Sequence, residues 1–219
     1  MEPTVIGIDE AGRGSVLGPL VVGGFVTTPA IAATLPAWGV RDSKLLSPAQ
    51  RTVAYDHLAR LGTRLSIALP PSLVDRHVRH QGLNTLEASA FAGLIDRCAA
   101  ATAYVDACDP NAARFGATVQ RLAGRSVTVD ARHRADRDVP VVAAASIVAK
   151  VRRDRAIGRL ARRLGLPIGS GYPSDPTTVA AVEATLASAP GVPGWIRASW
   201  RTTQRLSPRP SARTLESFP

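Results

Sequence analysis

Cysteine, lysine and aromatic residues are all scarce in this 219-residue chain. Its two cysteines, Cys98 and Cys108, are too few for a disulfide framework and match no zinc spacing, so reduced thiols are expected. Aromatic residues are 5% of the chain, which makes an aromatic side chain in a loop conspicuous. Among 27 basic residues only Lys44 and Lys150 are lysines. These two positions either require a compact ammonium group or have kept it by chance.

Charge is absent from Ser15 to Val40, a stretch long enough to span a bilayer. However, Gly18-Pro19, Gly23-Gly24 and Pro29 interrupt it, and its β-branched clusters favour short buried strands. The chain start also lacks the charged and apolar regions of a signal peptide. The sequence therefore predicts a cytoplasmic protein without a membrane span.

The formal net charge of +10 favours a polyanionic partner, with nucleic acid first and an anionic membrane second. A GC-rich genome can also raise the arginine content at neutral positions, so charge alone does not decide. Six arginines, on a predicted helix, are expected to form a basic face that binds duplex phosphates: Arg152, Arg153, Arg155, Arg159, Arg162 and Arg163.

The periodicity of apolar residues predicts a mixed α/β sheet covered by helices, in one domain over residues 1–206. Strands are expected at residues 4–8, 20–27, 64–70, 103–108 and 126–131. Helices are expected at residues 48–61, 84–101, 142–164 and 178–188, with a short terminal element at 195–206. The helical C-terminal region covers about 166–206, and the Pro/Ser/Arg-rich residues 207–219 are expected to be disordered.

Four acids occupy unusual positions relative to these strands. Asp9 and Glu10 close the first strand, Asp106 sits in an apolar run, and Asp136 precedes the long helix. A carboxylate in an apolar strand is costly to bury unless it is paired or bound to metal. Strands of an α/β sheet bring their carboxyl ends together, and converging acids without Cys or His suit Mg²⁺ or Mn²⁺.

Neighbouring residues on a strand point to opposite faces of the sheet. Asp9 and Glu10 would therefore share one site only if the chain leaves the strand at that point. Gly12 and Gly14 make such a departure easy, because glycine tolerates unusual backbone angles. Taken alone, this acidic pair is equally compatible with a solvated strand end.

Five segments occur in order along residues 5 to 176: GIDEAGRG, VRDSKLLSP, YVDACDPNAARF, HRADRDVPVVAAASIVAKVRRDRAI and GSGYPSDP. This combination closely resembles ribonuclease HII, especially its archaeal and eukaryotic-like branch. The resemblance implies an RNase H-like fold with four catalytic, metal-binding acids, which fall here on Asp9, Glu10, Asp106 and Asp136. It implies two divalent cations, Mg²⁺ or Mn²⁺, of which one activates the attacking water and the other stabilises the leaving oxygen.

The resemblance also implies the activity. The expected enzyme is an endoribonuclease that hydrolyses the RNA strand of RNA–DNA hybrids and incises 5′ of single ribonucleotides in duplex DNA. It leaves 3′-hydroxyl and 5′-phosphate ends, and a monomer is expected. Discrimination of RNA from DNA requires a contact with the 2′-hydroxyl. By resemblance, Gly12, Arg13 and Gly14 supply that contact, and the Arg13 guanidinium also holds a phosphate.

Further substrate contacts follow from the same resemblance. Tyr172 is expected to stack on the deoxyribose after the ribonucleotide, or else to anchor its loop. The remaining expected contacts are two phosphate-binding lysines and two hydroxyl donors: Lys44, Lys150, Ser43 and Ser146. Ser15 stands where the family usually has proline, so a looser loop is expected there.

Several polar residues near these motifs have plainer interpretations. Asp109 is expected to act in a turn or behind the metal ligands, and Asp136 is favoured over Asp130 as the fourth ligand. His133 is expected to be solvated or to lie behind the ligands, and Asn84 to cap its helix. Asp154 is expected to be a buried acid paired with an arginine.

Two other functions remain open at this level. A non-catalytic nucleic-acid-binding module could share the fold, but would be expected to lack one or more of the four acids. A different metal nuclease of the same fold would not need the GRG and GYP segments.

Overall fold

The computed structural model describes residues 3–40, 43–80 and 82–207, apart from the side chain of Lys44. Within these residues a single mixed sheet has the strand order β3-β2-β1-β4-β5. Its strands are β1 (Val5–Ala11), β2 (Leu20–Thr27), β3 (Thr63–Leu69), β4 (Thr102–Asp106) and β5 (Thr128–Arg132). The first three strands are antiparallel neighbours, whereas β4 and β5 run parallel to β1. The predicted mixed α/β sheet is confirmed.

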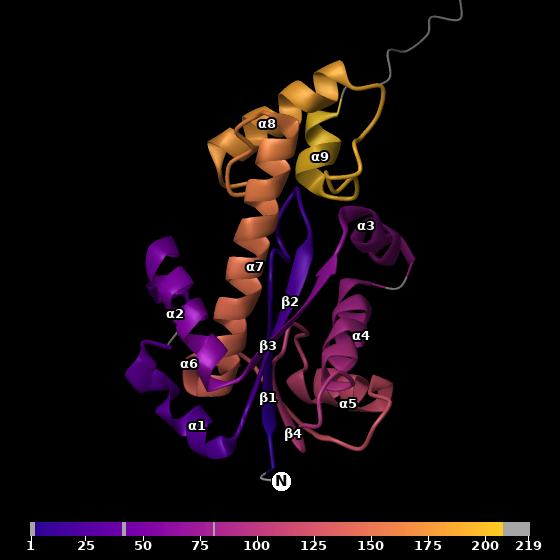
Figure 1. Cartoon of the computed structure of the whole chain (residues 1–219). Helices are drawn as coiled ribbons and strands as arrows, with labels where there is room; N and C mark the ends of the chain where they lie inside the picture. The colour runs from indigo at the N-terminus through magenta and orange to yellow at the C-terminus, as the bar shows by residue number, and fades with distance from the viewer. Residues whose placement is uncertain (1–2, 41–42, 81, 208–219) are drawn as a thin grey trace, which may run out of the picture.

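Helices cover both faces of the sheet (Figure 1). One face carries α1 (Pro29–Thr34), α2 (Pro48–Leu61), α6 (Ala135–Asp138) and the long α7 (Pro140–Leu164), with the short 3-10 turns η1 (Leu35–Trp38) and η2 (Ser43–Leu45). The other face carries α3 (Pro71–His80), α4 (Leu83–Ile95) and α5 (Ala112–Leu122). The helices α8 (Pro176–Ser188) and α9 (Arg201–Leu206) lie beyond the sheet, beside the C-terminal end of α7.

The helix α7 lies very close to the two central strands because glycines face it. A Cβ on Gly7 of β1 would come within 2.1 Å of the Val141 carbonyl oxygen, and one on Gly23 of β2 within 2.5 Å of the Ala149 amide nitrogen. Real Cβ atoms do not approach other atoms so closely. The close packing sets α7 directly beside Asp9, which is paired with Gly23 in the sheet.

The C-terminal region docks on the loop after β1. Val16 and Leu17 pack there against Ile196 in a small apolar cluster separate from the main core. The Arg197 amide donates to the Val16 carbonyl at 2.8 Å. Residues 208–219, which contain most of the predicted tail, lie outside the described residues. In the part of the chain that is described, no helix is long and apolar enough to cross a membrane.

Some sequence-based expectations were wrong or incomplete. The helices α3 and α5 were not predicted, although Asn111 caps α5 by accepting from the Arg114 amide at 2.9 Å. The expected Asn84 cap is absent, because α4 begins at Leu83 and its N-cap is Gly82. Asp154 is half exposed rather than buried, with its carboxylate 3.6 Å from the Arg51 guanidinium.

Candidate active site

Three predicted acids converge at the carboxyl end of the parallel strands. Asp9 lies in β1, Asp106 ends β4, and Asp136 lies in the short α6 after β5. One carboxylate oxygen from each lies within 4.8 Å of the others. Asp9 and Asp136 are buried, and Asp106 is half buried. Parallel pairing of β1 with β4 and of β4 with β5 produces this meeting point.

Glu10 is placed differently from the other three acids. The strand β1 continues to Ala11, so the expected departure from the strand at Asp9-Glu10 was wrong. Alternation along a regular strand would turn Glu10 away from Asp9, yet its carboxyl group is close enough to that of Asp9 for a side-chain hydrogen bond between them to raise its pKa. Within the described residues, Glu10 is not a member of the three-acid group. Its pKa is nevertheless raised well above the usual value, first by burial and then by the nearby charges of Asp9 and Asp106.

Burial and mutual repulsion make these carboxylates costly to ionise without a cation. Burial, together with the charges of Asp9 and Asp136, raises the pKa of Asp106 from 3.8 to about 6. Burial likewise raises the pKa of Asp9, partly offset by Lys150 and by a hydrogen bond from Ser146. The carboxylate oxygens of the three acids are negatively charged and lie close together, and hard divalent cations prefer such ligands. The three acids can therefore hold a metal ion.

The second wall of the site comes from α7. The Ser146 hydroxyl lies 2.7 Å from the Ser43 hydroxyl. The Lys150 ammonium donates to the Ser146 hydroxyl at 2.9 Å. Both serines are fully buried. The lysine charge and the hydroxyls thus border Asp9. The side chain of Lys44 lies outside the described residues.

The turn after β1 is closed by Ser15, the residue at which the sequence predicted a looser loop. Gly12 has φ +88°, and a Cβ there would come within 2.5 Å of the Arg153 side chain. The buried Ser15 donates its hydroxyl to the Gly12 carbonyl at 2.8 Å, and its amide donates at 3.3 Å. Gly14 is exposed, with open space where a Cβ would be. The expected looser turn is therefore tied by two hydrogen bonds.

Arg13 is held by polar side chains from α4. Its guanidinium forms an ion pair with the fully buried Glu87 and donates to the Asn84 side chain at 2.6 Å. The Asn84 amide in turn donates to Asp109 at 2.7 Å. Asp109 also accepts from the Asn111 amide at 2.8 Å, so it acts as the turn-forming acid that the sequence allowed.

Tyr172, in the loop between α7 and α8, covers a buried arginine. The Arg153 guanidinium lies 4.3 Å from the centre of its ring and donates to the Ser170 carbonyl at 2.8 Å. Arg153 is 3% exposed and lies between Gly12 and Gly171. Its inclusion in an exposed basic face was wrong, because it joins the GRG and GYP segments instead.

Arg197 is a second buried arginine that supports the same turn. Its guanidinium donates to the Arg13 carbonyl at 2.9 Å and to the Gly18 carbonyl at 3.3 Å. It is stacked 4.7 Å from the Trp200 ring centre. The carboxylate of Asp75 accepts from the Ala198 and Ser199 amides and fixes this segment. The C-terminal region therefore helps to position the GRG turn.

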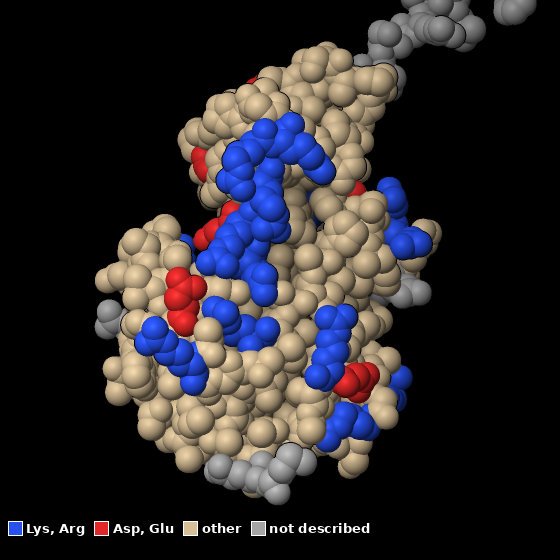
Figure 2. All heavy atoms as spheres, in the orientation of Figure 1, with Lys and Arg blue, Asp and Glu red and all other residues tan. Residues whose placement is uncertain are grey.

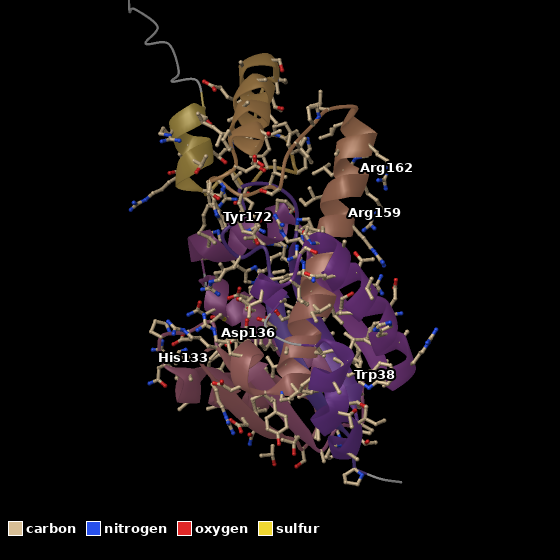
Figure 3. The ribbon with its side chains drawn as sticks, turned by 90° about the vertical axis from the view of Figure 1, so that its left-hand side faces the viewer. Trp38, His133, Asp136, Arg159, Arg162 and Tyr172 are labelled. Atoms are coloured by element: carbon tan, nitrogen blue, oxygen red, sulfur yellow. The ribbon has the colours of Figure 1, made fainter. Side chains whose placement is uncertain are left out.

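Sequence reasoning missed Glu87, Arg153 and Arg197. An acid in the apolar run LEASAFAGLI could have pointed to Glu87, but nothing in the local sequence distinguishes the two arginines from exposed ones. The alternatives Asp130 and His133 lie apart from the three-acid group. Asp130 pairs with Arg132 at 2.6 Å, and His133 is exposed at the outer surface (Figure 3).

Comparison with known proteins gives the same family over nearly the whole chain. Residues 6–203 match the ribonuclease HII family. Ribonuclease HII from Cenarchaeum symbiosum is 44% identical over 198 residues, which are 90% of this chain and 95% of that protein. The crystal structure of ribonuclease H2 from Pyrococcus horikoshii has a TM-score of 0.85 at 37% identity, and the match covers 93% of this chain and 96% of that one.

A further similar structure is that of the PCNA:RNase HII complex from Archaeoglobus fulgidus. The match has a TM-score of 0.82 at 34% identity and covers 94% of this chain and 98% of that chain. Together with the converging acids and the GRG turn, these similarities show that the chain belongs to the ribonuclease HII family.

Proposed function

We propose that this chain is a metal-dependent ribonuclease H that cuts the RNA strand of RNA–DNA hybrids and incises 5′ of single ribonucleotides in duplex DNA. The products carry 3′-hydroxyl and 5′-phosphate ends, and the enzyme acts as a cytoplasmic monomer. The observation that carries the proposal is the group of Asp9, Asp106 and Asp136 beside a glycine turn of fixed shape.

The three grouped acids would hold Mg²⁺ or Mn²⁺, with Glu10, whose carboxyl group lies close to Asp9 and Asp106, as the fourth ligand. Bound divalent cations in such sites supply a nucleophilic water and stabilise the leaving oxygen. The protein's own part is to fix the carboxylates with backbone hydrogen bonds, which partly offset the rise in their pKa caused by burial. The amide of Ala135 donates to Asp106 at 3.1 Å, and the amide of Glu10 donates to Asp9 at 2.7 Å.

Recognition of the ribose is assigned to the turn of Gly12, Arg13 and Gly14. The exposed backbone at Gly14 allows a sugar to approach without meeting a Cβ. Amides and carbonyls in this turn can pair with a 2′-hydroxyl, which is both donor and acceptor. The side chain of Arg13 is one-third exposed and has further N–H donors for a phosphate beyond those used by Glu87 and Asn84.

The other contacts complete a path for the substrate. Tyr172 would stack on the deoxyribose that follows the ribonucleotide. The Arg153 guanidinium, 4.3 Å from the centre of the Tyr172 ring, would hold the ring in place. The remaining contacts would go to the phosphate backbone, from Ser43, Lys44, Ser146 and Lys150. In the structure Lys150 already lies beside Asp9, so it would also stabilise negative charge at the site.

The experiment compares four duplexes: all-DNA, all-RNA, an RNA–DNA hybrid, and DNA with one ribonucleotide. Each is incubated with Mg²⁺ or Mn²⁺ and with chelator. We expect metal-dependent cutting of the hybrid and a single incision 5′ of the lone ribonucleotide. Equal cutting of all-DNA would refute the proposal, and chelator-resistant cutting would refute the role of the carboxylates.

A further inference from the structure

The helix α7 carries two rows of polar side chains with identical spacing. Ser146, Lys150 and Arg153 form the row that faces the site. An arginine follows each of them after nine residues, at Arg155, Arg159 and Arg162. Nine residues are about two and a half turns of α-helix, so the second row lies on the opposite side of the helix.

The figures show that Arg159 and Arg162 of this row lie on a different side of the molecule from Asp136. Lys and Arg side chains gather in a continuous band over the C-terminal half of α7 (Figure 2). In the view turned by 90°, Arg159 and Arg162 point outward on one side, whereas Asp136 and His133 lie on the other (Figure 3). A substrate held at the carboxylates would therefore not cover the row formed by Arg155, Arg159 and Arg162.

The charge of this row is largely uncompensated. The row lines an open groove of about 430 Å³ beside Pro48 and Thr52 of α2, in which the only acid is Asp154. Asp154 already lies 3.6 Å from Arg51 and 3.8 Å from Arg153. Among the described residues, none of the three arginines in the row has an acidic partner within salt-bridge distance.

Arg155, at the N-terminal end of the row, packs on an aromatic ring, which reduces the side-chain entropy lost on binding. The Arg155 guanidinium lies 4.7 Å from the ring centre of the buried Tyr55, and that of Arg64 lies 4.1 Å from the same ring. Arg152 lies 5.9 Å from it. Three guanidinium groups thus converge on one ring, and in the described part of the chain the only acid within salt-bridge distance of them is the exposed Asp56, which lies 3.9 Å from Arg64. Their mutual repulsion favours a polyanion at this surface.

We propose that the arginine row of Arg155, Arg159 and Arg162 binds the phosphate backbone of a second duplex, separate from the one held at the carboxylates. The row spans about 10 Å along α7. Over that length B-DNA presents about six phosphate charges. The groove beside the row exposes no aromatic anchor of the kind that protein interfaces use, so duplex fits better than an acidic protein. This surface would hold DNA near the enzyme. The proposal rests on the proposed function only in that a ribonuclease acting on duplexes has a use for such a surface.

The first test measures binding of all-DNA duplex without metal, over a range of salt concentrations. The variant replaces Arg159 and Arg162 by serine and leaves the packed Arg155 intact. The control replaces Arg97, in the turn after α4, and Arg121 of α5 by serine; both are exposed, so the control removes the same charge. The test variant should bind about tenfold more weakly, and the slope of log K against log salt should fall by about two. Equal losses in both variants would overturn the proposal.

The second test asks whether two duplexes bind at once. The Asp106→Asn protein is saturated with a short RNA–DNA hybrid and then titrated with labelled all-DNA duplex. We expect a ternary complex, which is lost when R159S and R162S are added to this background. Strict competition between the two nucleic acids would overturn the proposal, as would preferential binding of poly-glutamate at the same salt. Failure to incise ribonucleotides would refute the proposed function but leave this binding result unaffected.

Discussion

At the scale of single residues, Ser15 shows how a turn can be fixed without the ring of a proline. Proline would rigidify the turn through its ring, whereas Ser15 closes it through its hydroxyl and its amide. Both hydrogen bonds end on the Gly12 carbonyl, so they fix the peptide that begins the GRG segment. The hydroxyl is fully buried, so water does not replace its hydrogen bond when the hydroxyl is removed, and the loss of that bond costs free energy of folding.

Replacing Ser15 by alanine should therefore destabilise the protein by about 1 kcal/mol. For a chain of this size the melting temperature should fall by about 2–4 °C. The matched control is Ser89→Ala, which removes an exposed hydroxyl bonded to the Thr85 carbonyl at 3.0 Å and should change little. Thermal unfolding measures both variants. Equal, negligible shifts would show that the Ser15 hydroxyl does not hold the turn.

The carboxylates lead to a prediction about pH. Because the pKa of Asp106 is raised to about 6 in the folded chain, its protonated form stabilises the fold at low pH. That contribution is complete below about pH 4 and is lost as the pH rises through about 6. Without metal, the ionised group therefore costs stability at neutral pH. A bound divalent cation would offset that cost.

Asp106→Asn should consequently stabilise the metal-free protein at about pH 8 and not at about pH 4. The rise of the Asp106 pKa from 3.8 to about 6 would correspond to about 3 kcal/mol for a fully buried group. The side chain is only half buried, so screening leaves about 1 kcal/mol. Melting temperatures with chelator should rise by about 2–4 °C at the higher pH. Adding Mn²⁺ should stabilise the parent protein there and the variant much less. Equal Mn²⁺ effects on both would contradict the assignment of Asp106 as a ligand.

At the scale of elements, the position of α7 depends on the glycines beneath it. Gly7→Ala would place a Cβ within 2.1 Å of the Val141 carbonyl and push the helix away from β1. We expect a loss of about 3 kcal/mol, together with weaker metal binding because the Asp9–Ser146 contact opens. Gly158→Ala is the control, since its Cβ has only the flexible end of Arg162 at 3.7 Å and should be neutral or stabilising. Equal stability of both variants would refute the close packing.

The C-terminal region offers a second test at this scale. In Arg197→Lys one ammonium replaces the planar fork that donates to the Arg13 and Gly18 carbonyls. We expect KM for a ribonucleotide-containing duplex to rise several-fold, with a smaller change in kcat. Asp75→Asn loosens the attachment of the same region without touching the GRG turn. If both variants change KM equally at matched folded fractions, Arg197 acts only through the stability of the region.

At the scale of the whole molecule, sequence reasoning succeeded where chemistry contrasts with its surroundings. Carboxylates in apolar strands stand out, and the parallel order of β1, β4 and β5 brings Asp9 and Asp106 together. The end of β1 was misjudged, because its extension to Ala11 depends on pairing with β2, which no local pattern encodes. Arg153 was misplaced for a similar reason. Its burial depends on two loops, at Gly12 and Gly171, that are distant in sequence.

The most direct test of the central claim measures binding and incision together, in the parent chain and in Asp106→Asn. The substrate is end-labelled duplex DNA with one ribonucleotide, and the cofactor is Mn²⁺. We expect the parent chain to cut once, 5′ of the ribonucleotide, and to leave a 3′-hydroxyl. The variant should bind this duplex within about threefold of the parent but lose at least about a hundredfold in single-turnover rate, as expected for removal of a group that stabilises the transition state. Near-parental incision by Asp106→Asn would contradict the account.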